Sequence, residues 1–206
     1  MSEHRIVVGG AAYQVKVDGD GPPLLLLHGF TGSSQNWEPL VPAFAERYTV
    51  VRVDLLGHGQ TNAPHESSRY AMPYAANDLI KIMQHLNYSE FHLLGYSMGG
   101  RLALYTAAHY PDAVQTLALE SASPGLTTAE ERAERVKRDE ALADRIQREG
   151  IPAFVDFWES ISLFASQTNV PEVDRQRLRA QRLTNHPIRL ANSLHGMGTG
   201  VQPSQW

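Results

Sequence analysis

Short apolar runs alternate with longer amphipathic segments along residues 1–123. The run of leucines at 24–27 is typical of a strand that is buried on both faces. Two β-prone runs at 6–8 and 13–17 are separated by glycines and predict a hairpin. The other predicted strands and the helices between them lie at 37–46 (helix), 49–53 (strand), 73–86 (helix), 91–94 (strand), 98–109 (helix) and 114–120 (strand). This alternation predicts an α/β fold with a mostly parallel sheet covered on both faces.

After Pro124 the pattern changes. Residues 127–150 are charge-dense and helical, 154–164 are rich in aromatic side chains, and 174–183 are basic and helical. No strand-like run occurs there, so we expect a helical insertion that lies over the sheet. We therefore expect the N-terminal part of an α/β core at 1–123 and the helical insertion at 124–195. The start of a return to the core follows at 196–206.

Composition narrows the classes of function. The formal net charge of −4 gives no electrostatic reason to expect a nucleic-acid partner. The absence of cysteine excludes disulfides, thiolate catalysis and thiolate metal sites. No apolar run is long enough to cross a bilayer, and the N-terminus does not resemble a signal peptide, so we expect a cytoplasmic protein. Nothing in the sequence indicates a metal or an organic cofactor.

The motif Gly95-Tyr96-Ser97-Met98-Gly99 carries the clearest chemical signal. It lies between a predicted strand and a predicted helix, which is the context of a nucleophile elbow. The turn is tight, so small residues must flank the serine, and Ser97 would project from the edge of the sheet. The amide of Met98, at the start of the helix, can then donate to a developing oxyanion. We therefore predict Ser97 as the catalytic residue of an α/β-hydrolase fold.

Two further turns agree with this fold. His28-Gly29-Phe30 directly follows the leucine run, where such folds place the second oxyanion donor, here the amide of Phe30. Asp54 begins an Asp-x-x-Gly-x-Gly turn after the next strand, and its glycines suit a sharp bend. We expect His28, Asp54 and His58 to be structural rather than catalytic.

The partners of the serine are not evident. The fold places them in the order serine, acid, histidine, each on a loop after a later strand. His186 and His195 belong to or adjoin the helical insertion, and neither follows a strand. We therefore expect the acid and the base to lie beyond Trp206, in a chain truncated at its C-terminus, with residues 114–120 as an unpaired edge strand. Such a chain would be inactive or impaired, because a serine without its base is weakly reactive.

Several segments resemble the MenH family, the 2-succinyl-6-hydroxy-2,4-cyclohexadiene-1-carboxylate synthases of menaquinone biosynthesis. The resemblance extends from about residue 24 to the last residue. The nucleophile motif is shared with many hydrolases, whereas the motifs of the insertion are more particular. The matching segments are GYSMGGR (95–101), LALESASPGL (117–126), FVDFWE (154–159), LFASQ (163–167) and SLHGMGTG (193–200).

The resemblance implies a lyase that eliminates pyruvate from 2-succinyl-5-enolpyruvyl-6-hydroxy-3-cyclohexene-1-carboxylate, with Ser97 as the base. A substrate with several carboxylates needs cations, and Arg101 lies one helical turn after Ser97. The resemblance adds substrate contacts from the side chains of Arg135, Arg182, Trp158 and Tyr96. From the residues alone, these arginines could equally be surface residues, and Trp158 a core residue. A carboxylesterase or C–C bond hydrolase, and a non-catalytic or inactive fragment on the same fold, stay open as alternatives.

Overall fold

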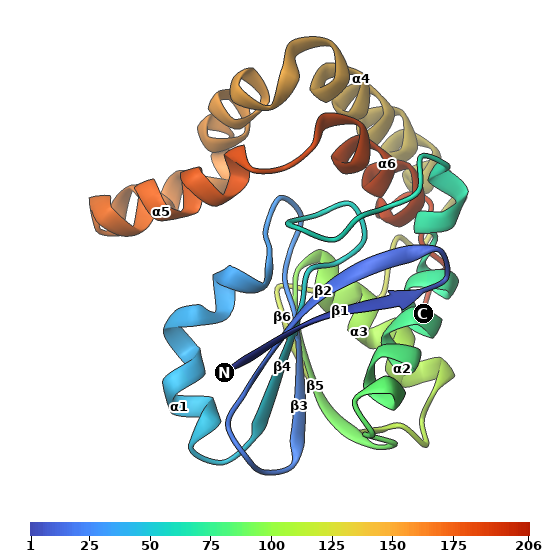
Figure 1. Cartoon of the computed structure of the whole chain (residues 1–206). Helices are drawn as coiled ribbons and strands as arrows, with labels where there is room; N and C mark the ends of the chain where they lie inside the picture. The colour runs from blue at the N-terminus through green and yellow to red at the C-terminus, as the bar shows by residue number, and fades with distance from the viewer.

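The computed structural model describes residues 1–206, apart from the side chain of Ser166. Its centre is a six-stranded sheet with the strand order β1-β2-β4-β3-β5-β6 (Figure 1). The first two strands, β1 (Ser2–Val8) and β2 (Ala11–Asp18), form the predicted hairpin, and β2 also pairs antiparallel with β4. The four remaining strands pair in parallel, namely β3 (Pro23–Leu27), β4 (Thr49–Val53), β5 (Phe91–Tyr96) and β6 (Val114–Glu120). The prediction of a mostly parallel α/β sheet is confirmed.

Helices cover both faces of this sheet (Figure 1). Helices α2 (Met72–His85) and α3 (Met98–His109) lie on one face and contribute to the larger apolar core. On the other face, the 3₁₀ helix η1 (Ser34–Leu40) and the short helix α1 (Val41–Ala45) pack against buried residues of β3 and β4. Most of the leucine run in β3 is fully buried, as its continuous apolar pattern predicted.

The single helix predicted at 37–46 is wrong. The structure has the 3₁₀ helix η1 followed by only five residues of α-helix in α1. Two prolines explain the difference, because Pro39 lies inside η1 and Pro42 at the start of α1, and neither can donate a helical hydrogen bond. Ser33 caps η1 by accepting a hydrogen bond from the Gln35 amide.

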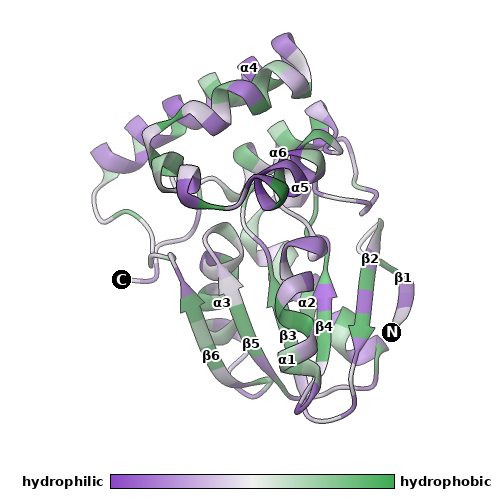
Figure 2. Ribbon diagram, turned by 90° about the vertical axis from the view of Figure 1, so that its left-hand side faces the viewer, coloured by the Kyte–Doolittle hydropathy of each residue, from purple (hydrophilic) through white to green (hydrophobic). Residues whose placement is uncertain are grey.

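The rest of the chain is helical and lies across the carboxyl ends of the parallel strands (Figures 1 and 2). Figure 2 shows the parallel strands as mainly hydrophobic, whereas α4 and α5 carry many hydrophilic residues. Among the described residues, no strand follows β6. The elements of this helical layer are α4 (Ala129–Ser160), η3 (Ser162–Asn169), α5 (Glu172–Leu183) and α6 (Pro187–Met197). The domain boundaries drawn at residues 123 and 195 stay a prediction.

The helical layer agrees with the sequence pattern at Gly150, where the first helical segment of α4 ends. The φ of 79° and ψ of 170° at Gly150 are not helical, and a second helical segment with Pro152 in its first turn follows directly. Helix α6 runs through Gly196 to Met197, so the glycine-rich stretch does not interrupt it. Gly196 is required at this place, because a Cβ built on it would lie 2.5 Å from the Cβ of Tyr70 in the core. Close contact with the core therefore fixes α6.

Strand β6 forms one edge of the sheet, as expected. Most of its residues are exposed, and Leu119 has 43% of its surface accessible. In the described part of the chain, none of the helices has the length and apolar character needed to span a membrane.

Candidate active site

The nucleophile turn joins β5 to α3 and has the strained geometry that the sequence predicts. Ser97 has a φ of 53° and a ψ of −114°, an unusual conformation for a residue with a side chain. The flanking glycines make this turn possible, because a Cβ on Gly95 would lie 2.4 Å from the Gly99 carbonyl oxygen, and a Cβ on Gly99 would lie 2.4 Å from the carbonyl oxygen of His28. The Ser97 amide donates to the carbonyl oxygen of Glu120 at 2.8 Å and ties the turn to β6.

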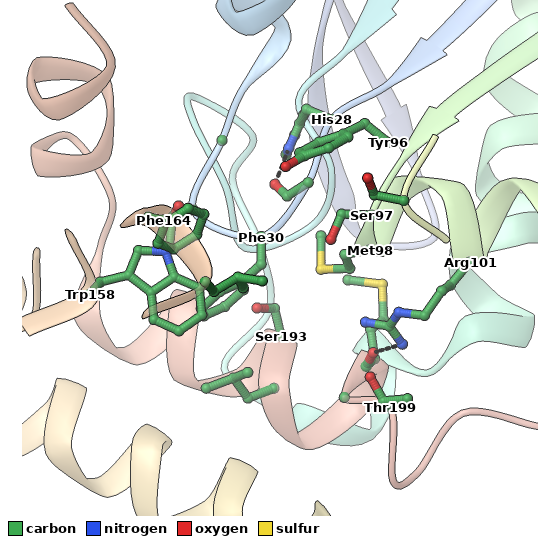
Figure 3. A pocket seen from close by; sticks show the side chains of 18 of the residues that line it. His28, Phe30, Tyr96, Ser97, Met98, Arg101, Trp158, Phe164, Ser193 and Thr199 are labelled. Carbon is green, nitrogen blue, oxygen red and sulfur yellow. Dashed lines mark hydrogen bonds between the residues drawn. The ribbon is translucent and has the colours of Figure 1, made fainter. Parts of the chain in front are cut away.

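The loop after β3 lies directly against this turn. A Cβ built on Gly29 would lie 3.3 Å from the Cβ of Ser97, so the neighbouring residue Phe30 is held close to the serine (Figure 3). Among the described residues, the amides of Phe30 and Met98 donate no hydrogen bond. Two unused N–H donors beside a serine are what an oxyanion hole requires.

The histidines behind this loop are structural. His28 accepts the Leu55 amide on Nε2 at 2.9 Å, and its Nδ1 lies 2.8 Å from the carbonyl oxygen of Gly29, so Nδ1 carries the proton. Burial lowers the pKa of His28, although the charge of Asp54 opposes this. Burial, followed by the neighbouring His28, lowers the pKa of His58 to about 3. Both rings are therefore neutral at pH 7, and Nε2 of His58 has no partner among the described residues.

Asp54 organises the loops rather than the chemistry. Its two carboxylate oxygens accept hydrogen bonds from the amides of Ser34 at 2.7 Å and Gln60 at 2.8 Å. These bonds join the start of η1 to the turn that follows β4. The structural role expected for Asp54 agrees with this arrangement.

A cavity of about 1100 Å³ lies between the nucleophile turn and the helical layer (Figure 3). Its floor comes from the loops after the parallel strands, and its roof from α4, η3, α5 and α6. Every residue that the sequence indicated for the site contributes to its lining: Phe30, Tyr96, Ser97, Met98, Arg101, Arg135, Trp158 and Arg182.

Two arginines predicted from the sequence lie in the roof, and each has a carboxylate partner. Arg135 donates from Nε to Asp139 Oδ1 at 2.8 Å, one helical turn along α4. Arg182 donates from Nη1 to Glu159 Oε1 at 2.9 Å. Neither Asp139 nor Glu159 was predicted as a partner from the sequence, although the four-residue spacing of Arg135 and Asp139 is that of a helical ion pair.

The arginine of the floor has neutral partners. Nη1 of Arg101 donates to the carbonyl oxygen of Met197 at 2.9 Å and, at short range, to Oε1 of Gln202. Burial and then the charge of Arg135 lower the pKa of Arg101 to about 10, while Asp139 opposes the shift. Arg101 is therefore still a cation at neutral pH. No sequence pattern indicated Gln202 as a partner of Arg101, because the two residues are 101 positions apart in the chain.

Aromatic side chains form the wall between these arginines. The ring of Phe30 lies edge-on to Trp158 with centroids 5.4 Å apart, and Trp158 contacts Phe164 at the same centroid distance (Figure 3). The indole N–H of Trp158 is buried and has no acceptor among the described residues. The Arg182 guanidinium lies 5.3 Å from the centre of the Phe164 ring. The cavity thus combines cations with an apolar wall that can face a ring.

No described residue acts as a base on the serine. None of the described histidines forms a hydrogen bond with Ser97 Oγ, and neither His186 nor His195 lines the cavity. Burial, followed by the charges of Arg189 and His65, lowers the pKa of His186. Both histidines thus lie outside the residues that line the cavity, in agreement with the expectation that neither is the base of Ser97.

Comparison with known proteins agrees with the geometry. Residues 22–193 match the family model of the alpha/beta hydrolase fold. The 2-succinyl-6-hydroxy-2,4-cyclohexadiene-1-carboxylate synthase of Pectobacterium atrosepticum is 33% identical, over 88% of this chain and 70% of its own length. A Bacillus subtilis protein that bears the same name provisionally is 47% identical, over 97% of this chain and 73% of its own length. The structure of MenH from S. aureus superposes with a TM-score of 0.87 at 33% identity, covering 94% of this chain and 73% of that one.

The strand–serine–helix turn and the helical roof over the sheet define the class of protein as an α/β-hydrolase fold. The similarity over nearly the whole chain narrows this class further. The chain belongs to the MenH family within the alpha/beta hydrolase fold.

Proposed function

We propose that this chain has the activity named for its relatives, the synthesis of 2-succinyl-6-hydroxy-2,4-cyclohexadiene-1-carboxylate in menaquinone biosynthesis. The observation that carries the proposal is one cavity that is lined by Ser97, four arginines and an aromatic wall. A small substrate with a six-membered ring and several carboxylates matches this combination, because arginine binds carboxylates through two parallel hydrogen bonds. A plain esterase has no need of several cations around its serine.

The proposed reaction is an elimination. Ser97, in its deprotonated form, takes a proton from the ring of 2-succinyl-5-enolpyruvyl-6-hydroxy-3-cyclohexene-1-carboxylate and becomes a hydroxyl, and the bond between the ring and the enolpyruvyl oxygen breaks. The electron pair of the C–H bond becomes a ring double bond, and the leaving enolate takes a proton to become pyruvate. The amides of Phe30 and Met98 would stabilise the negative charge that develops on the substrate.

The first prediction concerns the rate of this reaction. Because no described base contacts Ser97, we expect pyruvate release by these 206 residues to be about 10³-fold slower, or more, than by the Bacillus subtilis relative. Ser97→Ala should abolish the remaining release, whereas Ser89→Ala, at an exposed loop position, should not change it. Pyruvate is measured in a coupled enzymatic assay. Turnover of simple esters without any pyruvate release would contradict the proposal in favour of a hydrolase.

A further inference from the structure

The four arginines that line the cavity differ in the charge of their partners. Arg135, Arg138 and Arg182 are each paired with a carboxylate, although Glu159, the partner of Arg182, also pairs with Arg179. The two hydrogen bonds of Arg101 within the described chain end on an amide oxygen and a backbone carbonyl, both of them neutral. Arg101 is therefore the arginine of the cavity whose hydrogen-bond partners are all neutral, and the charge of Asp139 acts on it without a hydrogen bond between them.

Gln202 supplies one of these neutral oxygens from behind the cavity. It is only 4% exposed and does not line the cavity, so it cannot touch a substrate there. Its amide group is oriented by chemistry, because turning the NH₂ group toward a guanidinium would bring two donors together. Gly125 leaves room for that NH₂ group, since a Cβ at this position would lie 2.9 Å from Nε2 of Gln202.

The segment that carries Gln202 is itself anchored. The backbone N–H of Gln202 donates to the carbonyl oxygen of Gly198 at 3.0 Å, and this bond closes a turn directly after α6. Three residues later, the Gln205 amide donates to the carbonyl oxygen of Pro124 at 2.8 Å. Figure 3 shows Arg101 reaching from α3 toward this segment, beside Thr199. The glutamine is thus part of a fixed support and not of a loose tail.

We propose that Gln202 is a positioning residue that fixes the guanidinium of Arg101 while leaving its full positive charge available to a substrate carboxylate. The inference rests on the proposed function. A carboxylate in place of the amide would hold Arg101 equally well but would cancel its charge and repel an anion. An apolar side chain would preserve the charge but would leave the guanidinium with only its hydrogen bond to the carbonyl oxygen of Met197. Both the shape and the neutrality of glutamine are therefore required.

The test separates these two requirements in the intact chain. Gln202→Glu removes the neutrality, Gln202→Met removes the hydrogen bond, and Gln147→Glu adds the same charge at an exposed position on α4. The first measurement is the NMR resonance of the Arg101 Nη1–H in the free protein, because Nη1 donates to Gln202, and it is assigned through its loss in Arg101→Lys. The second is the Kd of the reaction product, 2-succinyl-6-hydroxy-2,4-cyclohexadiene-1-carboxylate, followed by tryptophan fluorescence. Thermal unfolding identifies any variant that does not fold.

We expect Gln202→Glu to keep a distinct Arg101 resonance but to raise the Kd about tenfold or more. Gln202→Met should move that resonance toward the position of a free arginine, because only the bond to Met197 remains, and should also raise the Kd. Gln147→Glu should match the wild type in both measurements. If Gln202→Met does not fold, Gln202→Asn, whose shorter amide cannot reach Arg101, replaces it.

Other results would overturn the inference. A Kd for Gln202→Glu equal to that of Gln147→Glu would show that neutrality is irrelevant, and an unmoved resonance in Gln202→Met would show that Gln202 does not hold Arg101. If the wild type binds no product but its resonance responds as expected, the proposed function fails and the positioning role stands.

Discussion

At the scale of single residues, the histidines beneath the oxyanion loop show how burial sets protonation. His58 is completely enclosed, and its ring lies edge-on to His28 and Phe30, with centroids 5.2 Å and 5.8 Å away. A charged imidazolium there would face a neighbouring imidazole and no carboxylate within hydrogen-bonding distance. The native state therefore binds no proton at His58 until the pH falls to about 3.

This burial predicts acid sensitivity. Between pH 6.5 and about 3 the unfolded chain protonates His58 while the native protein does not, so stability falls as the pH falls. One such group contributes a slope of about 1.4 kcal/mol per pH unit in the free energy of unfolding. Urea unfolding across this range should give a slope smaller by about that amount in His58→Asn. The control His85→Asn, at an exposed position, should keep the wild-type slope, and an equal slope in His58→Asn would refute the argument.

At the scale of elements, the contact of β3 with the start of α3 leaves no room for a side chain. A Cβ on Gly99 would lie 2.4 Å from the carbonyl oxygen of His28 and 2.5 Å from that of Leu27. Backbone atoms cannot give way as the end of a flexible side chain can. The close approach of helix and strand therefore depends on this glycine, and with it the direction in which Ser97 points.

We predict that Gly99→Ala lowers the free energy of unfolding by about 3 kcal/mol, because the helix must shift away from the strand. Gly10→Ala is the control, since Gly10 has a φ of 80° but no atom within 4 Å of an added Cβ. That substitution should cost only the backbone strain, about 1 kcal/mol. Chemical denaturation measures both values, and a Gly99→Ala variant as stable as the wild type would disprove the role of the close contact.

Elements with local signals were predictable from the sequence, and contacts between distant segments were not. The helix at 98–109 and the strands at 49–53 and 114–120 have the expected bounds, since glycine, proline or charged residues flank clear apolar runs. The prediction of one helix at 37–46 was wrong, because Pro39 and Pro42 cannot donate the hydrogen bonds that a continuous helix requires. Likewise Ser97 followed from its motif, whereas the partners of the arginines depend on how α4, α5 and the segment after α6 pack together.

At the scale of the whole molecule, the two edge strands of the sheet differ in character. The hairpin strand β1 forms one edge, and its exposed residues are polar apart from Val7. On the other side, β6 presents exposed apolar side chains and, within the described chain, no strand beyond it. Open apolar edges promote pairing between molecules.

We therefore predict self-association that increases with protein concentration and that Leu119→Lys suppresses, because the change removes an apolar side chain and adds a charge at the edge. Ile188→Lys makes the same change at similar exposure, 41% against 43%, but on α6. Sedimentation velocity over a concentration series compares the two variants. Equal suppression by both would mean that general charge, and not the edge, controls association.

The hydrogen bond from the Ser97 amide to Glu120 links this open edge to the chemistry. The nucleophile turn is strained, so it persists only while its neighbours hold it. Edge strands open locally at a free-energy cost well below that of global unfolding. Local opening of β6 would thus remove a support of the Ser97 turn in a molecule that is otherwise native, so the turn would lose its geometry before the fold is lost.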